Sequence, residues 1–161
     1  MKSFSPFLFV VCCFWILISS CSGDVVPVDP NIPADLKTLN DNISKDSMNA
    51  EYYYDRSQYF FKVQDISLAI RDVQKALKLD STKAKYYLAM GDFHFAINKT
   101  SVTIESLRRA AKLEPENKEI MLKLGELFYI VMKYDSAIYY VNRSLSIEET
   151  NPKAHFQKGM I

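Results

Sequence analysis

The chain has 161 residues, of which 48% are hydrophobic and 24% are charged, a size and composition typical of one globular domain. It carries 20 basic and 19 acidic residues, which gives a formal net charge of +1. Nucleic-acid-binding proteins need an excess of cationic side chains to contact phosphates, so this charge balance gives no reason to expect nucleic acid as a partner.

The first twenty residues predict a secretory signal peptide. They contain one basic residue, Lys2, then an apolar run of twelve residues from Phe7 to Ile18 and two serines. This run is shorter than the ~20 residues that span a bilayer, but it matches the apolar region of a signal peptide. We therefore expect residues 1–20 to be removed before the chain folds.

Cys21 follows the expected signal peptide directly. The residues before it are Ile18, Ser19 and Ser20, a branched aliphatic residue and two small ones. This segment resembles the lipobox of bacterial lipoproteins, in which the cysteine receives a diacylglycerol and a further acyl chain such as palmitate. Several acyl chains anchor a protein stably, since each buried methylene contributes about 0.8 kcal/mol. The resemblance implies a lipid anchor at Cys21 in the bacterial envelope, and an ordinary signal peptide with a chance cysteine is the alternative.

Further details bear on location and on thiol chemistry. Ser22 stands where some proteobacterial lipoproteins carry an aspartate that retains them in the inner membrane, so the outer membrane is favoured. Three Asp-Ser-X tripeptides resemble the O-glycosylation acceptor of exported Bacteroidetes proteins; they begin at Asp46, Asp80 and Asp135.

With Cys12 and Cys13 removed and Cys21 lipidated, the mature chain has no thiol for a disulfide, a metal site or a nucleophile. We expect neither a metal nor a cofactor.

Two short segments precede the main part of the chain. Residues 21–34 predict a flexible tether, because they have little to bury and contain Pro27, Pro30 and Pro33. Residues 35–49 predict an N-terminal helix or half-repeat, because one helical face carries Leu36, Leu39 and Ile43.

Three glycines then recur at equal spacing. Gly91, Gly125 and Gly159 are 34 residues apart, which is the pattern of an internal repeat. Aligning them divides the chain without gaps into residues 50–83, 84–117, 118–151 and a truncated fourth repeat, 152–161. Small residues fall at the same places in these repeats, and we expect them to pack the repeats together. They are Ser57, Ala69, Ala76, Gly91, Thr103, Ala110, Gly125, Ala137, Ser144 and Gly159.

Each repeat predicts a pair of antiparallel helices. Its apolar residues recur every three or four positions in two runs, which the first repeat places at 50–63 and 66–79. The breaks between the runs, such as Gln64-Asp65 and Asn98-Lys99, leave room only for a tight turn. Two helices approach to about 8 Å only where one of them presents little side chain, which accounts for the small residues.

From residue 50 to 161 the chain resembles the tetratricopeptide repeat (TPR) family. The resemblance implies an all-α solenoid of antiparallel helix pairs, wound as a right-handed superhelix, with about three full repeats and partial repeats at both ends. The first helix of each pair would line the inner, concave wall. Three departures from the family pattern are Arg56-Ser57 for an aliphatic-glycine pair, Thr103 for an alanine, and a closing proline only at Pro115.

The family's inner-wall positions predict a partner-binding groove. Carried over residue by residue, they give an apolar stripe with a polar edge, suited to an extended peptide or an amphipathic helix. The predicted groove residues are Tyr54, Gln58, Phe61, Leu88, Asp92, Phe95, Leu122, Glu126 and Tyr129. The lysine and asparagine pattern that clamps a peptide carboxylate in some relatives is absent, which disfavours binding of chaperone tails. Ordinary packing of this stripe is the alternative.

The sequence gives little support for catalysis. His94 and His155 stand at places where the repeat has bulky aromatic residues, and no glycine-rich phosphate loop or nucleophile with a nearby histidine and aspartate is present. We therefore expect neither an enzyme nor a small-molecule substrate.

These observations predict a non-catalytic, lipid-anchored scaffold that binds another envelope protein. Two alternatives remain, an assembly factor for outer-membrane proteins or secretion pores, and the N-terminal part of a longer protein with a catalytic or signalling module. The second is considered because the chain stops at Ile161, two residues after Gly159 and before the second helix of the fourth repeat. We expect the native reading frame to continue or the gene model to be truncated.

Overall fold

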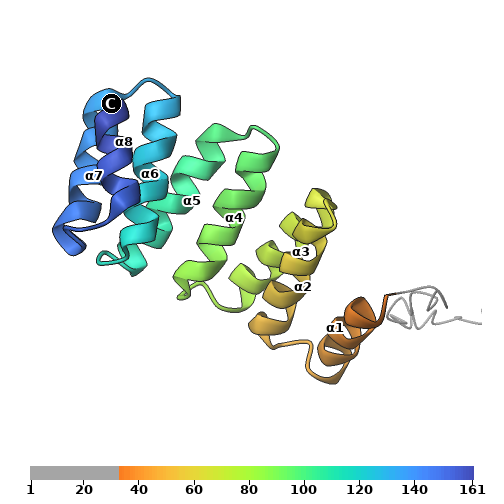
Figure 1. Cartoon of the computed structure of the whole chain (residues 1–161). Helices are drawn as coiled ribbons and strands as arrows, with labels where there is room; N and C mark the ends of the chain where they lie inside the picture. Colours follow the sequence, from red (N-terminus) through yellow and green to blue (C-terminus); the bar gives the residue numbers. More distant parts are fainter. Residues whose placement is uncertain (1–32) are drawn as a thin grey trace, which may run out of the picture. The chain divides into compact units, whose positions relative to one another are not determined.

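The computed structural model describes residues 33–161, and within this range it contains eight helices and no strand (Figure 1). The predicted signal peptide, the predicted lipidation site Cys21 and the predicted tether up to residue 32 lie outside the described residues. None of the helices in this part of the chain is long and apolar enough to cross a membrane. The helices are α1 Ala34–Lys45, α2 Ala50–Lys62, α3 Ile66–Leu79, α4 Ala84–Ala96, α5 Thr100–Leu113, α6 Lys118–Ile130, α7 Tyr134–Ile147 and α8 Pro152–Met160.

Helices α2 to α7 pack as three successive pairs. The helix α2 packs most closely on α3, α4 on α5, and α6 on α7, so that each pair corresponds to one predicted repeat. The second helix of each pair contacts the first helix of the next, and α7 contacts α8 in the same way (Figure 1). The predicted all-α arrangement of helix pairs is confirmed.

The turn inside each pair has the same backbone conformation. Its central residue has a positive φ, 65° at Gln64, 58° at Asn98 and 58° at Met132. The next N–H bonds back to a carbonyl of the first helix, as from Asp65 to Phe60 at 2.9 Å. This pattern is a Schellman-type helix end, which bonds the last carbonyls of the helix and reverses the chain within two residues.

Asparagine side chains cap the N-termini of three of the first helices. Asn49, Asn117 and Asn151 precede α2, α6 and α8, and each side chain accepts hydrogen bonds from the first turn of its helix. Such caps bind backbone N–H groups that have no partner inside the helix. The corresponding residue before α4 is Lys83, which makes no side-chain cap.

Most of the predicted repeat-packing residues lie at helix crossings. The exposed fraction is at most 3% for Ser57, Ala69, Ala76, Thr103, Ala110, Ala137 and Ser144. Gly91 and Gly125 are also buried, and a β-carbon on Gly125 would lie 2.7 Å from Val141 Cγ2. Gly159 is different, because it is exposed and a β-carbon there would meet nothing within 4 Å. Among the described residues Gly159 therefore packs no repeats, since no second helix lies over it.

The helix α1 is attached to the first pair more loosely. It begins at Ala34, one residue before the predicted boundary, and none of its residues is fully buried. It contacts α2, and Leu36 packs against the core formed by α2, α3 and α4.

Candidate functional site

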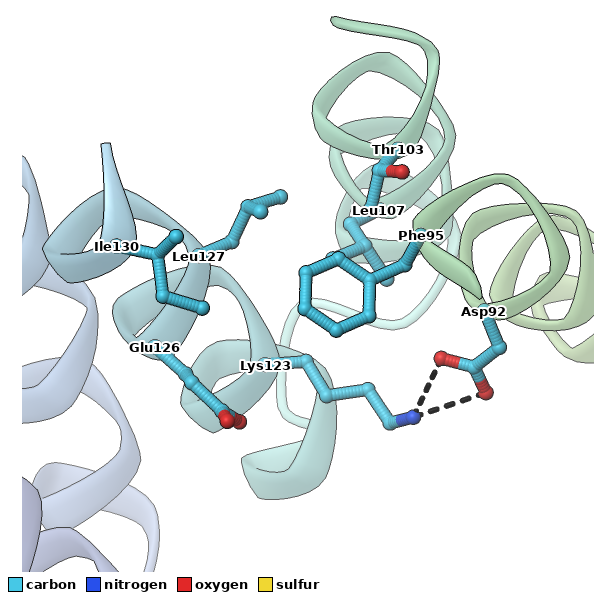
Figure 2. Close-up of a pocket in the computed structure, with 8 residues that line it drawn as sticks. All are labelled: Asp92, Phe95, Thr103, Leu107, Lys123, Glu126, Leu127 and Ile130. Atoms are coloured by element: carbon cyan, nitrogen blue, oxygen red, sulfur yellow. Dashed lines mark hydrogen bonds and ion pairs between the residues drawn. The ribbon is translucent and has the colours of Figure 1, made fainter. Parts of the chain in front are cut away.

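The first helices α2, α4, α6 and α8 carry the predicted groove residues and their equivalents, and we call this surface the first-helix wall. One hollow in this wall lies where α4, α5 and α6 meet (Figure 2). The hollow has a volume of about 120 Å³. We refer to it as the α4–α6 cavity. Its lining residues are Asp92, Phe95, Thr103, Leu107, Lys123, Glu126, Leu127 and Ile130.

Apolar side chains form the floor and sides of the α4–α6 cavity. Leu107 and Leu127 are each only 3% exposed and form the floor, whereas Phe95 and Ile130 are 46% and 50% exposed. Figure 2 shows the Phe95 ring reaching from α4 toward α5 and α6. An engineered apolar cavity of ~150 Å³ holds benzene, so a hollow of this size suits one bulky apolar side chain.

The rim of the α4–α6 cavity is charged. Lys123 Nζ on α6 lies 2.6 Å from Asp92 Oδ1 and 2.9 Å from Asp92 Oδ2 on α4, an ion pair that joins the second and third repeats (Figure 2). Glu126, one turn further along α6, forms no ion pair with any residue of 33–161. The mouth of the cavity therefore has one neutralised pair and one free carboxylate.

Glu126 also lines a second hollow, between α6 and α8. This hollow is lined by Glu126, Pro152, Lys153, Phe156, Gln157 and Met160. Phe156 is 69% exposed and Met160 is 44% exposed, so this hollow also presents apolar side chains. We refer to this second hollow as the α8 hollow.

The first repeat contributes a hydrogen-bonded network to the wall. Glu51 forms an ion pair with Lys85 and accepts a hydrogen bond from the Tyr86 hydroxyl at 2.9 Å. Burial raises the pKa of Tyr86, and the hydrogen bond to Glu51 adds to the effect. The Lys85 ammonium also lies 4.8 Å from the centre of the Tyr54 ring. This network links α2 to α4 and covers part of the wall.

The predicted groove residues divide into exposed and covered ones. Phe95 and Glu126 are exposed, and Gln58, Leu88, Asp92 and Tyr129 are half-buried. Tyr54 packs against Tyr86 with ring centres 5.2 Å apart, and Phe61 against Phe93 at 4.7 Å. Leu122 is only 8% exposed, because α7 and α8 close over it. The predicted stripe is therefore open mainly at Phe95 in the second repeat and at Glu126 in the third.

Sequence reasoning missed several residues of this site. Ile130 and Lys123 on α6 were not predicted, and neither were Phe156 and Met160 on α8. A signal existed for the last two, since they stand 34 residues after Leu122 and Glu126. Phe156 and Met160 therefore hold the same places in the fourth repeat.

The histidines and other potential metal ligands of the described residues are arranged as follows. No group of three His, Cys, Asp or Glu side chains in 33–161 is placed to hold a metal ion. One ring nitrogen of His94 lies 2.8 Å from the Met90 carbonyl, and one of His155 lies 2.7 Å from the Glu149 carbonyl. Both histidines thus hydrogen-bond to the backbone.

No protein-family model matches the chain, and no curated protein matches it in sequence. Solved structures do match it. A crystal structure of MamA has a TM-score of 0.72 and 23% identity, covering 78% of this chain and 73% of MamA. YrrB, described as a TPR protein with an unusual peptide-binding site, has a TM-score of 0.71 and 22% identity, covering 78% of this chain and 64% of YrrB.

A third similar structure is the first TPR of Spaghetti (RPAP3) bound to the HSP90 peptide SRMEEVD. It has a TM-score of 0.66 and 19% identity, and the match covers 71% of this chain and 91% of that one. The chain therefore has the fold of a TPR solenoid, built from antiparallel helix pairs.

Proposed function

We propose that this chain is a non-catalytic scaffold that binds a peptide or helix of another protein along its first-helix wall. The observation that carries the proposal is the α4–α6 cavity, where Phe95 and Ile130 remain exposed above a buried apolar floor. A pocket for an apolar anchor with a polar rim is the usual arrangement for recognising extended peptides and amphipathic helices.

Two of the similar structures support a protein partner. YrrB is described as having a peptide-binding site, and the RPAP3 domain was solved with a peptide bound. Both share the helix-pair fold with this chain, and TPR domains typically present binding surfaces rather than catalytic groups.

A screen of random displayed peptides against the purified protein tests this proposal. We expect some selected peptides to lose at least tenfold in affinity on Phe95→Ala, because that change removes one side of the cavity. Tyr139→Ala is the matched control, since Tyr139 is 58% exposed on α7 and does not line the cavity. If no selected peptide depends on Phe95, the wall is not the binding surface.

We further propose that the scaffold is lipid-anchored through Cys21 in the bacterial cell envelope, with the outer membrane favoured. The support is the lipobox-like segment Ile18-Ser19-Ser20-Cys21 after an apolar run. In a detergent phase-partition experiment, Cys21→Ala should move the protein from the detergent phase to the aqueous phase. Unchanged partitioning of Cys21→Ala would show that Cys21 is not the anchor.

A further inference from the structure

Glu126 is the one charged residue lining the α4–α6 cavity that has no ion-pair partner among residues 33–161. The cavity has three charged lining residues, Asp92, Lys123 and Glu126. Lys123 and Asp92 neutralise each other at 2.6 Å, which leaves the Glu126 carboxylate to set the net charge at the mouth. The cavity therefore combines an apolar interior with an uncompensated negative rim.

The neighbouring surface keeps this carboxylate accessible. Glu126 is exposed, and it lines both the α4–α6 cavity and the α8 hollow. Lys153 lines the α8 hollow as well but forms no ion pair with Glu126. Gln157, which lines the same hollow, has a buried Oε1 with no hydrogen-bond donor among the described residues. Two acceptors at this junction, the Glu126 carboxylate and Gln157 Oε1, thus have no partner among residues 33–161, and the Lys153 ammonium beside them has no ion pair there either.

From this geometry we infer the chemistry of the partner, an inference that rests on the proposed function. The α4–α6 cavity takes a bulky apolar side chain, and Glu126 takes a lysine or arginine that lies close to it in the same partner segment. A segment that fills both the α4–α6 cavity and the α8 hollow passes over Glu126, because Glu126 borders both. The partner is thus a basic, apolar segment rather than an acidic tail.

Charge complementarity supports this choice over the alternatives. An anionic residue at the same point would face Glu126 with no free cation among the cavity-lining residues to offset the repulsion. A cation there gains a carboxylate partner at the rim of the cavity. Electrostatic complementarity at a rim of this kind sets specificity more than total affinity.

The peptides selected by the random screen give the first test. Among those that depend on Phe95, we expect a large apolar residue with lysine or arginine within a few positions. Selected peptides that depend on Phe95 but are acidic or neutral around the apolar residue would overturn this inference and leave the binding function standing. Absence of any Phe95-dependent peptide would instead remove the proposed binding along the first-helix wall.

The second test exchanges charges between Glu126 and the peptide. Fluorescence polarisation measures the affinity of one selected basic peptide and of the same peptide with its lysine or arginine changed to glutamate. Glu126→Lys should weaken the basic peptide by at least tenfold and strengthen the glutamate peptide. The isosteric Glu126→Gln should weaken the basic peptide by a smaller factor and reduce the loss of affinity caused by added salt.

Glu119→Lys is the matched control, because Glu119 is also exposed on α6 but does not line the cavity. It should leave both affinities within about twofold, as expected of an exposed, screened charge outside the cavity. Equal effects of Glu126→Lys and Glu119→Lys would show a general charge effect on the protein surface and would overturn the assignment of the cation to Glu126.

Discussion

Arg56 on α2 holds Asp72 on α3 through two hydrogen bonds, from Nε to Oδ2 at 2.6 Å and from Nη2 to Oδ1 at 3.0 Å. The Asp72 side chain is only 2% exposed. The third nitrogen, Arg56 Nη1, donates to Asn40 Oδ1 on α1 at 2.8 Å. One arginine at an interior position therefore ties three helices together.

Replacing Arg56 alone should be strongly destabilising. Arg56→Met leaves the buried Asp72 carboxylate with only a long contact of 3.5 Å from Arg71 Nε. Breaking a buried ion pair in this way typically costs about 3–5 kcal/mol. We expect urea denaturation to show a loss of that size in the free energy of unfolding. The double change Arg56→Met with Asp72→Leu should recover most of it, since the next repeat places an apolar Met90 opposite an uncharged Ser106.

The matched control for this prediction is Arg109→Met. Arg109 pairs with Glu105 on the surface of α5, where the two side chains are 58% and 61% exposed. Exposed pairs of this kind contribute about 0.5 kcal/mol or less. A loss on Arg56→Met no larger than the loss on Arg109→Met would mean that the buried pair does not stabilise the fold.

The same arginine shows what the sequence could and could not predict about the fold. The repeat length and the helix pairs were readable because Gly91 and Gly125 sit at close helix contacts that tolerate little side chain. From the sequence, the pair Arg56-Ser57 could be recognised only as a departure from the aliphatic-glycine pair of the TPR pattern. Its compensation lies in Asp72 and Asn40, each 16 residues away on a different helix, and spacing alone does not identify such partners.

The candidate site was predictable in position but not in shape. The repeat register places Phe95 and Glu126 on the first-helix wall, and both are exposed there. The repeat register does not show how closely the helices of successive repeats pack. The burial of Leu122 under α7 and α8 was therefore not predicted. For the same reason the depth of the cavity, which depends on Leu107 from a second helix, was not predicted.

Removing the side chain from a left-handed turn residue should stabilise the protein. Met132 has a φ of 58°, a conformation that costs L-residues roughly 1–2 kcal/mol, and its side chain is 76% exposed. Glycine has no such strain but loses about 0.5–1 kcal/mol more backbone entropy on folding. We expect Met132→Gly to raise the free energy of unfolding by about 0.5–1 kcal/mol, measured as a shift in the urea midpoint.

Asn98 provides the comparison for that prediction. It has the same φ of 58° in the second repeat, but asparagine tolerates this conformation better than methionine does. Asn98→Gly should therefore change stability by less than Met132→Gly. Equal gains at both positions would point to a general effect of glycine in these turns.

Adding a methyl group at the repeat glycines should give effects of different size at each position. In Gly125→Ala the new β-carbon would lie 2.7 Å from Cγ2 of Val141, a stiff β-branched side chain. Overpacking of this kind costs about 1–3 kcal/mol. In Gly91→Ala the nearest atom is Leu107 Cδ2 at 3.2 Å, the end of a more flexible side chain, so the loss should be smaller.

Gly159→Ala completes the series. Nothing lies within 4 Å of the added carbon, and alanine favours a helix over glycine by up to about 1 kcal/mol. We expect no loss of stability and a gain of a few tenths of a kcal/mol at most, because the residue lies in the last turn of α8. Thermal melts of the three variants should rank them in this order, and a loss at Gly159 as large as at Gly125 would contradict the packing described.

The network around Glu51 should make stability depend on pH in the acid range. Burial acts to raise the pKa of the Glu51 carboxyl, but the hydrogen bonds from Lys85 and Tyr86 outweigh it and hold the pKa below its ordinary value of 4.5. A carboxyl whose pKa is lowered by folding stabilises the folded state above the unfolded pKa, and that contribution is lost as the pH falls through the lowered pKa.

Glu51→Gln should therefore reduce the free energy of unfolding near neutral pH, and its difference from the wild type should shrink as the pH falls below 4.5. Urea denaturation at a series of pH values measures this difference. Glu119→Gln is the control, since Glu119 holds the same place in the third repeat without an ion pair among the described residues. A deficit for Glu51→Gln that stays constant from neutral to acid pH would mean that the carboxylate charge is not what stabilises the contact between α2 and α4.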